Sequence, residues 1–181
     1  PETAEAFGQW VARQRETETR RAALIDSREL GEKIHGACRE GIRALELSTN
    51  QDEGALEALY RSELWYAINR ALASLRYWQA WLDLSLAQHA ADSQQRLTDL
   101  SRARRGFEAS ALRILYPGLV YGSWLGLAYV AQLEGDEAGM QRRLTLLQQA
   151  LASDPDNPLQ EIVAMELGLI ALRLDDTGPI N

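Results

Sequence analysis

The residues that favour β-strands are scarce in this chain, and this scarcity bears on the fold class. Val occurs 4 times and Ile 8 times, against 29 Leu and 26 Ala. Leu and Ala favour helix, whereas β-branched residues favour strands. The composition therefore predicts an all-α protein, and the length of 181 residues suits a single domain spanning residues 1–181.

Cysteine and lysine are each represented by one residue, Cys38 and Lys33. A lone cysteine excludes an internal disulfide, and its apolar helical neighbours favour a packed thiol over a nucleophile. The net charge of -7 and the pI of about 4.9 argue against nucleic acid as a partner, because binding to phosphates requires a basic surface. The densest basic cluster, Arg102 to Arg105, lies beside Asp99 and Glu108 and is typical of a solvated helix face.

Long apolar runs are also missing. No stretch of about 18 apolar residues occurs, so we expect no transmembrane segment. No signal-peptide pattern is visible. The sequence begins with Pro1 rather than Met, so it does not decide between the cytoplasm and, with a signal removed, the periplasm.

Catalytic and cofactor motifs are absent as well. The sequence holds no Gly-x-Ser-x-Gly elbow, no phosphate loop and no Gly-x-Gly-x-x-Gly. Glu32 and His35 have the Glu-x-x-His spacing of di-iron bundles, but the only other histidine, His89, has leucine three positions before it. Two histidines and one cysteine far apart make no zinc ligand set. We therefore expect a protein that is not an enzyme, with no catalytic residues, no cofactor and no metal.

Apolar spacing and turn signals predict about six to eight helices. The first helical segment has a possible break near Gly31, which would divide it in two, and the second has a possible break near Ala73 and Ser74. Pro117 and Gly118 are expected to end the third helical segment, which starts at Gln94. The tail from Asp175 to Asn181 is expected to fray. The predicted helical segments cover residues 3–48, 53–91, 94–116, 119–133, 136–152 and 159–174.

Three sequence pieces in the C-terminal half share one pattern. Residues 107–114 are followed by Pro117, residues 124–129 read Trp-Leu-Gly-Leu-Ala-Tyr before Gly135-Asp136, and residues 149–158 end in Asp-Pro-Asp-Asn-Pro. Together these pieces resemble tetratricopeptide repeats, in which each repeat is a pair of antiparallel helices. A Leu-Gly at residues 167–168 echoes the start of a further repeat. Gly126 and Gly168 lie 42 residues apart against about 34 in the family, so we expect the intervening second helix to be longer by about a turn.

The resemblance implies a right-handed solenoid of hairpins over residues 77–174, preceded by helices of another type in residues 1–75. Proteins of this family bind a peptide or partner protein in a concave groove, and the groove residues vary freely. By the family pattern, Trp124 packs within its hairpin, whereas Tyr121 and Tyr129 face the groove. The resemblance therefore favours a non-catalytic scaffold for protein–protein interaction.

Aromatic residues crowd the second predicted segment, and core packing competes with an interface role for them. Trp78 and Trp81 are three residues apart on one helix face, so with Tyr121 and Tyr129 they are the candidate binding residues. An alternative function is a small-molecule or apolar-ligand domain in which the aromatic side chains line a pocket. Self-association is also plausible, because the charged middle of the first segment, residues 13–21, lacks apolar residues and could extend beyond the core.

Overall fold

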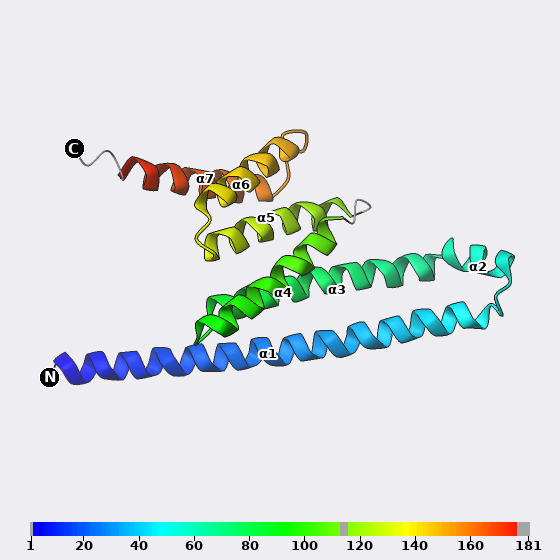
Figure 1. The fold of residues 1–181 in the computed structure, drawn as a ribbon, viewed down its shortest axis with the longest axis horizontal. Helices are drawn as coiled ribbons and strands as arrows, with labels where there is room; N and C mark the ends of the chain where they lie inside the picture. The colour runs from blue at the N-terminus through cyan, green and yellow to red at the C-terminus, as the bar shows by residue number, and fades with distance from the viewer. Residues whose placement is uncertain (1, 113–115, 177–181) are drawn as a thin grey trace. The chain divides into compact units, whose positions relative to one another are not determined.

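The structure is a computed structural model that describes residues 2–112 and 116–176. These residues form helices and no strand, which confirms the all-α class and the expected number of helices. Figure 1 shows them in chain order. The seven helices of the described residues are α1 (Glu2–Ser48), α2 (Glu53–Tyr60), α3 (Glu63–Gln88), α4 (Ser93–Ala111), α5 (Pro117–Leu133), α6 (Glu137–Leu151) and α7 (Leu159–Asp176).

The chain divides into two compact units, residues 1–99 and residues 100–181, and the boundary falls inside α4. The sequence predicts a border between the N-terminal helices and the repeat-like hairpins near residue 76. This position lies within α3, in the first unit. The assignment of the whole chain to one domain stays a prediction, as does the stacking of its hairpins into a right-handed solenoid.

The first unit is built on a long antiparallel pairing of α1 with α3 (Figure 1). Three cross-helix contacts show the direction: Arg28 meets Asp83, Gly31 meets Gln79, and His35 meets Arg76. The α1 positions rise in steps of three and four while the α3 positions fall. That spacing keeps one helix face against its neighbour over many turns, as in coiled-coil packing.

One expected break is absent because a glycine is used for packing. The helix α1 is continuous through Gly31, which is buried against α3. A Cβ atom at this position would lie 3.3 Å from Nε2 of Gln79, so the glycine allows the two helices to approach closely. Of the two sequence options, one long helix or two, the structure has one.

The break expected near Ala73 and Ser74 is wrong, because α3 runs through both residues and Ala73 is buried. The chain instead breaks at Ser62. Its hydroxyl oxygen accepts a hydrogen bond from the backbone N–H of Trp65 at 3.1 Å, which caps α3. The serine at residue 62 therefore starts a new helix, whereas the helix continues through residues 73 and 74.

A loop separates α1 from α2, in the gap between the predicted segments 3–48 and 53–91, so this gap is confirmed. Asn50 and Gln51 have φ angles of 50° and 61°, in the left-handed region. The carboxylate of Asp52 then accepts from the backbone N–H of Ala55 at 2.7 Å and caps α2. Likewise the carboxylate of Asp92 accepts from the backbone N–H of Gln95 at 2.7 Å, directly before the first residue of α4.

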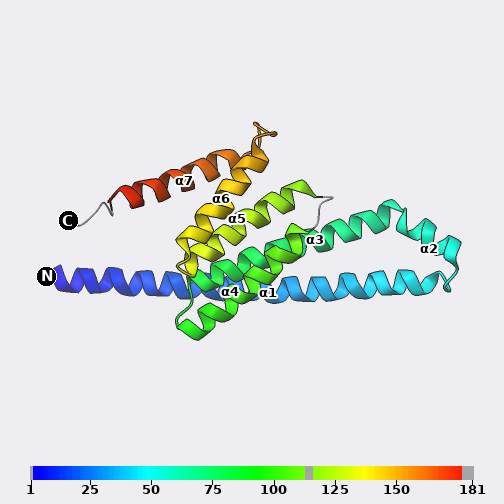
Figure 2. The same cartoon turned by 45° about the horizontal axis from the view of Figure 1, so that its top comes forward.

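The second unit contains the α5–α6 hairpin with α7 packed on α6, as Figure 2 shows clearly. Gly135 ends α5 with a φ of 80°, and Asp136 caps α6 through the N–H of Gly139 at 2.8 Å, so both sequence signals are confirmed. The core is made by α6 residues Leu144, Leu147 and Leu151, which have no exposed surface. The turn predicted at residues 154–158 separates α6 from α7.

Two predicted boundaries in this unit are wrong. The helix α4 ends at Ala111 rather than near residue 116, and Pro117 opens α5 instead of closing α4. Proline suits the first position of a helix because its missing N–H would have no partner there. Residues 113–115 and the tail residues 177–181 lie outside the described part of the chain, whereas Asp175 and Asp176 belong to α7.

Candidate functional site

A groove on the α5–α6 hairpin is the candidate binding site. It has a volume of about 510 Å³ and opens to solvent on one side. Its lining comes from both helices, and the residues are Trp124 and Leu127 of α5 with Arg143, Leu146, Gln149 and Ala150 of α6.

The chemistry of the groove is apolar with one positive charge. Leu127 is 8% exposed and forms a covered part of the wall, whereas Leu146 is 61% exposed. Arg143 is exposed and is the only charged residue among the described residues that line the groove. A ligand that fits this site would bring an apolar group against the two leucines and a negative charge toward the guanidinium.

The structure places the two candidate tyrosines differently. Tyr121 is half-buried, and its ring contacts the ring of Trp124 edge-on at 6.0 Å, so it packs on a residue of the groove lining. Trp124, which the family pattern placed inside the hairpin, lines the groove instead. The sequence signal for the α6 wall was the spacing of residues 143, 146 and 150 on one helix face, which we did not single out.

Tyr129 faces α7. Its hydroxyl donates a hydrogen bond to Oε1 of Glu166 at 3.0 Å. Burial, together with the hydrogen bond to Glu166 and the negative charge of Glu166, raises the pKa of this phenol to about 12. The hydroxyl is therefore engaged in joining α5 to α7. A binding role for Tyr129 stays a prediction.

The candidate tryptophans lie on α3 in the first unit. Trp78 is 61% exposed, whereas Trp81 is half-buried. The ring of Tyr77 contacts both, at 5.3 Å from Trp78 and 6.2 Å from Trp81. The four candidate binding residues are thus divided between the two units, and their role in binding stays a prediction.

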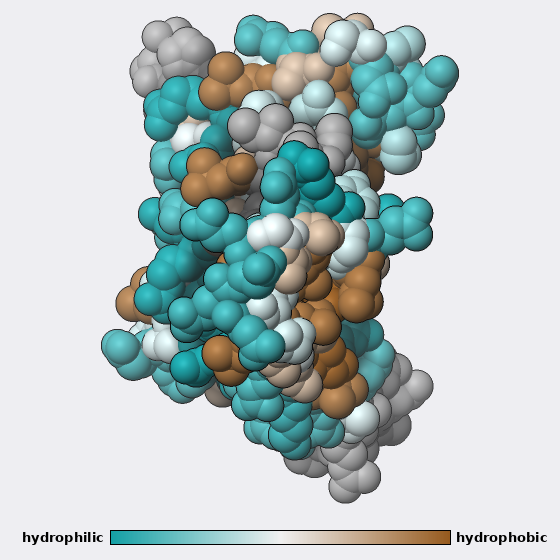
Figure 3. All heavy atoms as spheres, turned by 90° about the vertical axis from the view of Figure 1, so that its right-hand side faces the viewer, coloured by the Kyte–Doolittle hydropathy of each residue, from teal (hydrophilic) through white to brown (hydrophobic). Residues whose placement is uncertain are grey.

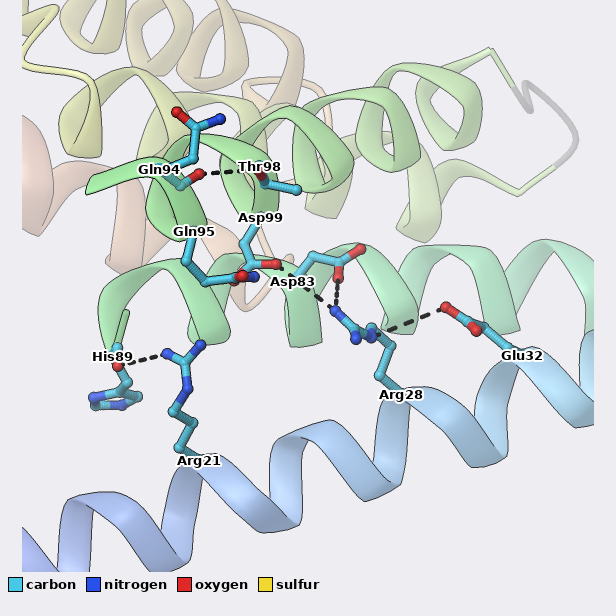
Figure 4. A network of polar contacts seen from close by, with 9 residues as sticks. All are labelled: Arg21, Arg28, Glu32, Asp83, His89, Gln94, Gln95, Thr98 and Asp99. Carbon is cyan, nitrogen blue, oxygen red and sulfur yellow. Dashed lines mark hydrogen bonds and ion pairs between the residues drawn. The ribbon is translucent and has the colours of Figure 1, made fainter. Parts of the chain in front are cut away.

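A polar cluster joins three helices of the first unit (Figure 4). The guanidinium of Arg28 lies 3.8 Å from the carboxylate of Asp83 and 3.7 Å from that of Asp99. Asp99 has no exposed surface and also accepts from the amide of Gln95 at 2.9 Å. Nearby, Arg21 donates to the backbone oxygen of His89 at 2.8 Å. Since one cation serves two acidic residues from different helices, the cluster fastens α1, α3 and α4 together.

The Glu-x-x-His pair is occupied by neighbouring side chains. Glu32 lies 3.9 Å from the guanidinium of Arg28, and Nε2 of His35 accepts a hydrogen bond from Nε of Arg76 at 3.1 Å. Desolvation lowers the pKa of His35, and the charges of Arg76 and Arg39 lower it further. Within residues 2–112 and 116–176, no group of three or more His, Cys, Asp or Glu side chains is placed to hold a metal ion.

Apolar side chains also reach the surface outside the groove. Figure 3 shows them as brown strips between hydrophilic areas. In the second unit they follow α7 at steps of three and four residues, which places them on one side of that helix. The exposed members of this stripe are Ile162, Met165, Leu169 and Leu172.

The fold and the groove define an all-α protein with a solvent-open apolar site on a helical hairpin. Comparisons with protein-family models, with curated proteins and with solved structures give no match. None of the described helices is both long and apolar enough to cross a membrane.

Proposed function

We propose that this chain is a non-catalytic protein-interaction module, and that the α5–α6 groove binds an amphipathic, acidic segment of a partner protein. The observation that carries the proposal is the groove itself, with its apolar lining and single arginine. The resemblance of residues 107–174 to helical-repeat hairpins agrees with this function.

The groove composition favours a peptide-like ligand. Leu127 and Leu146 offer apolar contact, while Gln149 and Arg143 offer polar groups at the same site. An amphipathic helix presents apolar side chains on one face and carboxylates beside them, so it matches both features at once. The positive charge of Arg143 selects acidic over basic segments, although the whole chain carries a net charge of -7.

A small apolar ligand is the second candidate function. The groove volume of about 510 Å³ falls within the range of roughly 300–1,000 Å³ that is usual for small-molecule sites. The ring of Trp124, which contacts the ring of Tyr121 edge-on, suits a flat apolar group. An anionic apolar molecule would satisfy Arg143 in the same way as a peptide carboxylate.

Fluorescence polarisation with two labelled helical peptides tests the proposal. One peptide carries Leu and Glu on a helical repeat, and the other carries Leu and Lys. We expect the Leu/Glu peptide to bind more tightly, and Arg143→Glu to reverse this preference. Leu146→Ser removes an apolar contact and should weaken binding roughly tenfold. Leu172→Ser is the matched control, because Leu172 is 66% exposed but lies outside the groove.

Two results would contradict the proposal. Equal binding of the acidic and basic peptides would remove the role of Arg143. Equal effects of Leu146→Ser and Leu172→Ser would show that the groove is not the binding site. Binding of an anilinonaphthalene sulfonate dye that depends on Leu146, with no binding of either peptide, would favour the small-ligand function instead.

A further inference from the structure

One side of the α1 helix carries an exposed stripe without charged residues. Its members recur at steps of three and four residues, so they lie along one face of the helix. Around its middle, the two members before Gly36 are large (Leu30 and Ile34) and the three after it are small (Ala37, Gly41 and Ala44). Its members are Ala23, Ser27, Leu30, Ile34, Ala37, Gly41, Ala44 and Leu47, and all are exposed.

The helix α3 carries a similar stripe. Its members also recur at steps of three and four residues, and four of the five are exposed while Ser74 is half-buried. They are Leu64, Ala67, Ala71, Ser74 and Trp78. Trp78 precedes Gln79, which faces α1, just as Leu30 precedes Gly31, which faces α3.

The two stripes lie on the same side of the hairpin. In each helix the stripe precedes by one residue the positions that face the other helix, which is a rotation of about 100°. Because α1 and α3 run in opposite directions, these two rotations are opposite in sense when viewed from one end. Both stripes therefore point to one side, and together we call them the hairpin face.

The other side of the hairpin is covered. On α3, the residues that follow the α1-facing positions are buried, for example Ala73, Ala80, Leu84 and Ala87. The hairpin face itself remains open, with Leu30 58% and Trp78 61% exposed. In Figure 3, which looks along the hairpin from its α1–α2 end, brown side chains form a strip on the right-hand side. A large exposed apolar area of this kind marks an interaction surface.

We propose that the hairpin face binds a second copy of this chain, with the two α1 helices antiparallel about a two-fold axis near Gly36. In this arrangement Leu30 lies opposite the partner's Gly41, and Ile34 lies opposite the partner's Ala37. These two central layers each pair a large side chain with a small one, which fills space evenly. A parallel pair would instead place small residues against small residues and leave voids.

The charges beside the stripe fit the same arrangement. Lys33 and Glu40 lie next to Ile34 and Gly41 on the flank of the stripe away from α3. With the two-fold axis near Gly36, Lys33 lies beside the partner's Glu40, and the symmetry generates the pair twice. Lys33 is the single lysine of the chain. In a parallel pair each Lys33 would instead lie beside the partner's Lys33, and no lysine–glutamate pair would form.

The size of the hairpin face is sufficient for a dimer. From Leu30 to Leu47 the face extends about 27 Å along α1 and about 20 Å across two helices, from the helix rise and diameter. These dimensions give ~1,100 Å² over both copies, just above the roughly 1,000 Å² that a specific interface needs. A two-fold interface uses the same surface on both copies, so no further partner is required.

Sedimentation equilibrium of the whole chain tests the dimer. We expect a concentration-dependent mass approaching twice the 20.2 kDa of one chain. Leu30→Glu should weaken the dimer by at least about 100-fold, because two glutamates would be buried at the interface. Leu97→Glu is the matched control, since Leu97 is 59% exposed on α4 and lies outside the hairpin face. Far-UV circular dichroism checks folding, and Ala37→Glu provides a second disruption at a small exposed position.

A charge swap tests the orientation. Lys33→Glu should weaken the dimer roughly tenfold, because it replaces two attractive pairs by two repulsive ones. Adding Glu40→Lys in the same chain should restore the dimer. A monomer at about 100 µM, a dimer that tolerates Leu30→Glu as well as it tolerates Leu97→Glu, or a double variant weaker than Lys33→Glu would each overturn the proposal. Peptide binding to the second unit is measured separately, so the two proposals fail independently.

Discussion

The ring of Phe107 occupies the space that a side chain at residue 126 would need. A Cβ atom built on Gly126 would lie 2.4 Å from Cζ of Phe107, and the ring has no exposed surface. The glycine of the Leu-Gly signature in α5 therefore serves a close approach to α4 inside the second unit. Glycine weakens a helix by about 1 kcal/mol relative to alanine, so packing offsets this cost.

Replacing Gly126 by alanine should therefore destabilise the protein despite the higher helix propensity of alanine. We expect a loss of about 1–3 kcal/mol in the free energy of unfolding, because the methyl group overpacks a buried ring. Urea denaturation measures the change. Gly168→Ala is the control, since no atom lies within 4 Å of a Cβ at that position in α7, and it should gain up to about 1 kcal/mol. A gain in both variants would show that the ring does not constrain residue 126.

Removing the guanidinium of Arg28 should cost far more than removing an exposed arginine. Arg28→Met leaves the carboxylates of Asp83 and Asp99 without this shared cation, and we expect a loss of roughly 3 kcal/mol. The control is Arg20→Met on the same helix. Its ion pair with Glu16 has side chains 59% and 71% exposed, so its loss should stay below about 1 kcal/mol. Equal losses in thermal or urea unfolding would contradict the role of the cluster.

The hydrogen bond from Tyr129 to Glu166 should contribute measurably to stability. Tyr129→Phe should lower the free energy of unfolding by about 1 kcal/mol at neutral pH, and Tyr121→Phe should lower it less. The pKa of Tyr129 is raised to about 12, so the folded state holds this proton more tightly than the unfolded state. Its contribution is complete below the unfolded value of about 10 and is lost as the pH rises from there toward 12.

Ultraviolet absorbance of the phenolate measures this titration directly. The last phenol to ionise in the folded protein should be missing from Tyr129→Phe and present in Tyr121→Phe. A titration curve that is the same in the two variants would contradict the assignment.

The pKa of His35 is lowered from 6.5, and this predicts a loss of stability in mild acid. The unfolded state takes up the proton more readily than the folded state, so the free energy of unfolding falls as the pH drops below 6.5 and through the lower folded pKa. Protonation also removes the acceptor for Nε of Arg76. His35→Gln should flatten the stability profile between about pH 7 and pH 5. An unchanged slope in this variant, measured by urea unfolding, would assign the acid sensitivity elsewhere.

Local signals in the sequence predicted the number of helices and many of their ends. Asp52, Asp136 and Gly135 act through their own turn, by capping or by adopting a left-handed backbone, and these effects depend on few neighbours. The internal boundaries were harder to predict. Gly31 looks like a weak point of a helix in isolation, but it packs against α3, and this burial outweighs its local propensity. Ala73 favours helix by itself, and α3 runs through it without a break.

The candidate site was only partly visible in the sequence. Tyr121 was predicted to face the groove and Trp124 to pack within the hairpin, whereas the α6 wall with Arg143 and Leu146 was not predicted. The three- and four-residue spacing of that wall is common to every exposed helix face, so it does not mark a site by itself. Tyr129 seemed equally available, yet its hydroxyl bonds Glu166, which lies 37 residues away in the sequence. Such a partner is determined by how α7 packs.

The sequence by itself determined that this protein is all-α, that its net charge is negative, and where most of its turns fall. Helix propensity and capping act at short range, so they can be read without the tertiary structure. The tertiary structure decided which apolar stripes are covered and which remain open. That choice depends on how helices pack against one another, since a stripe such as the one containing Leu30 reads the same in the sequence whether it is buried or exposed.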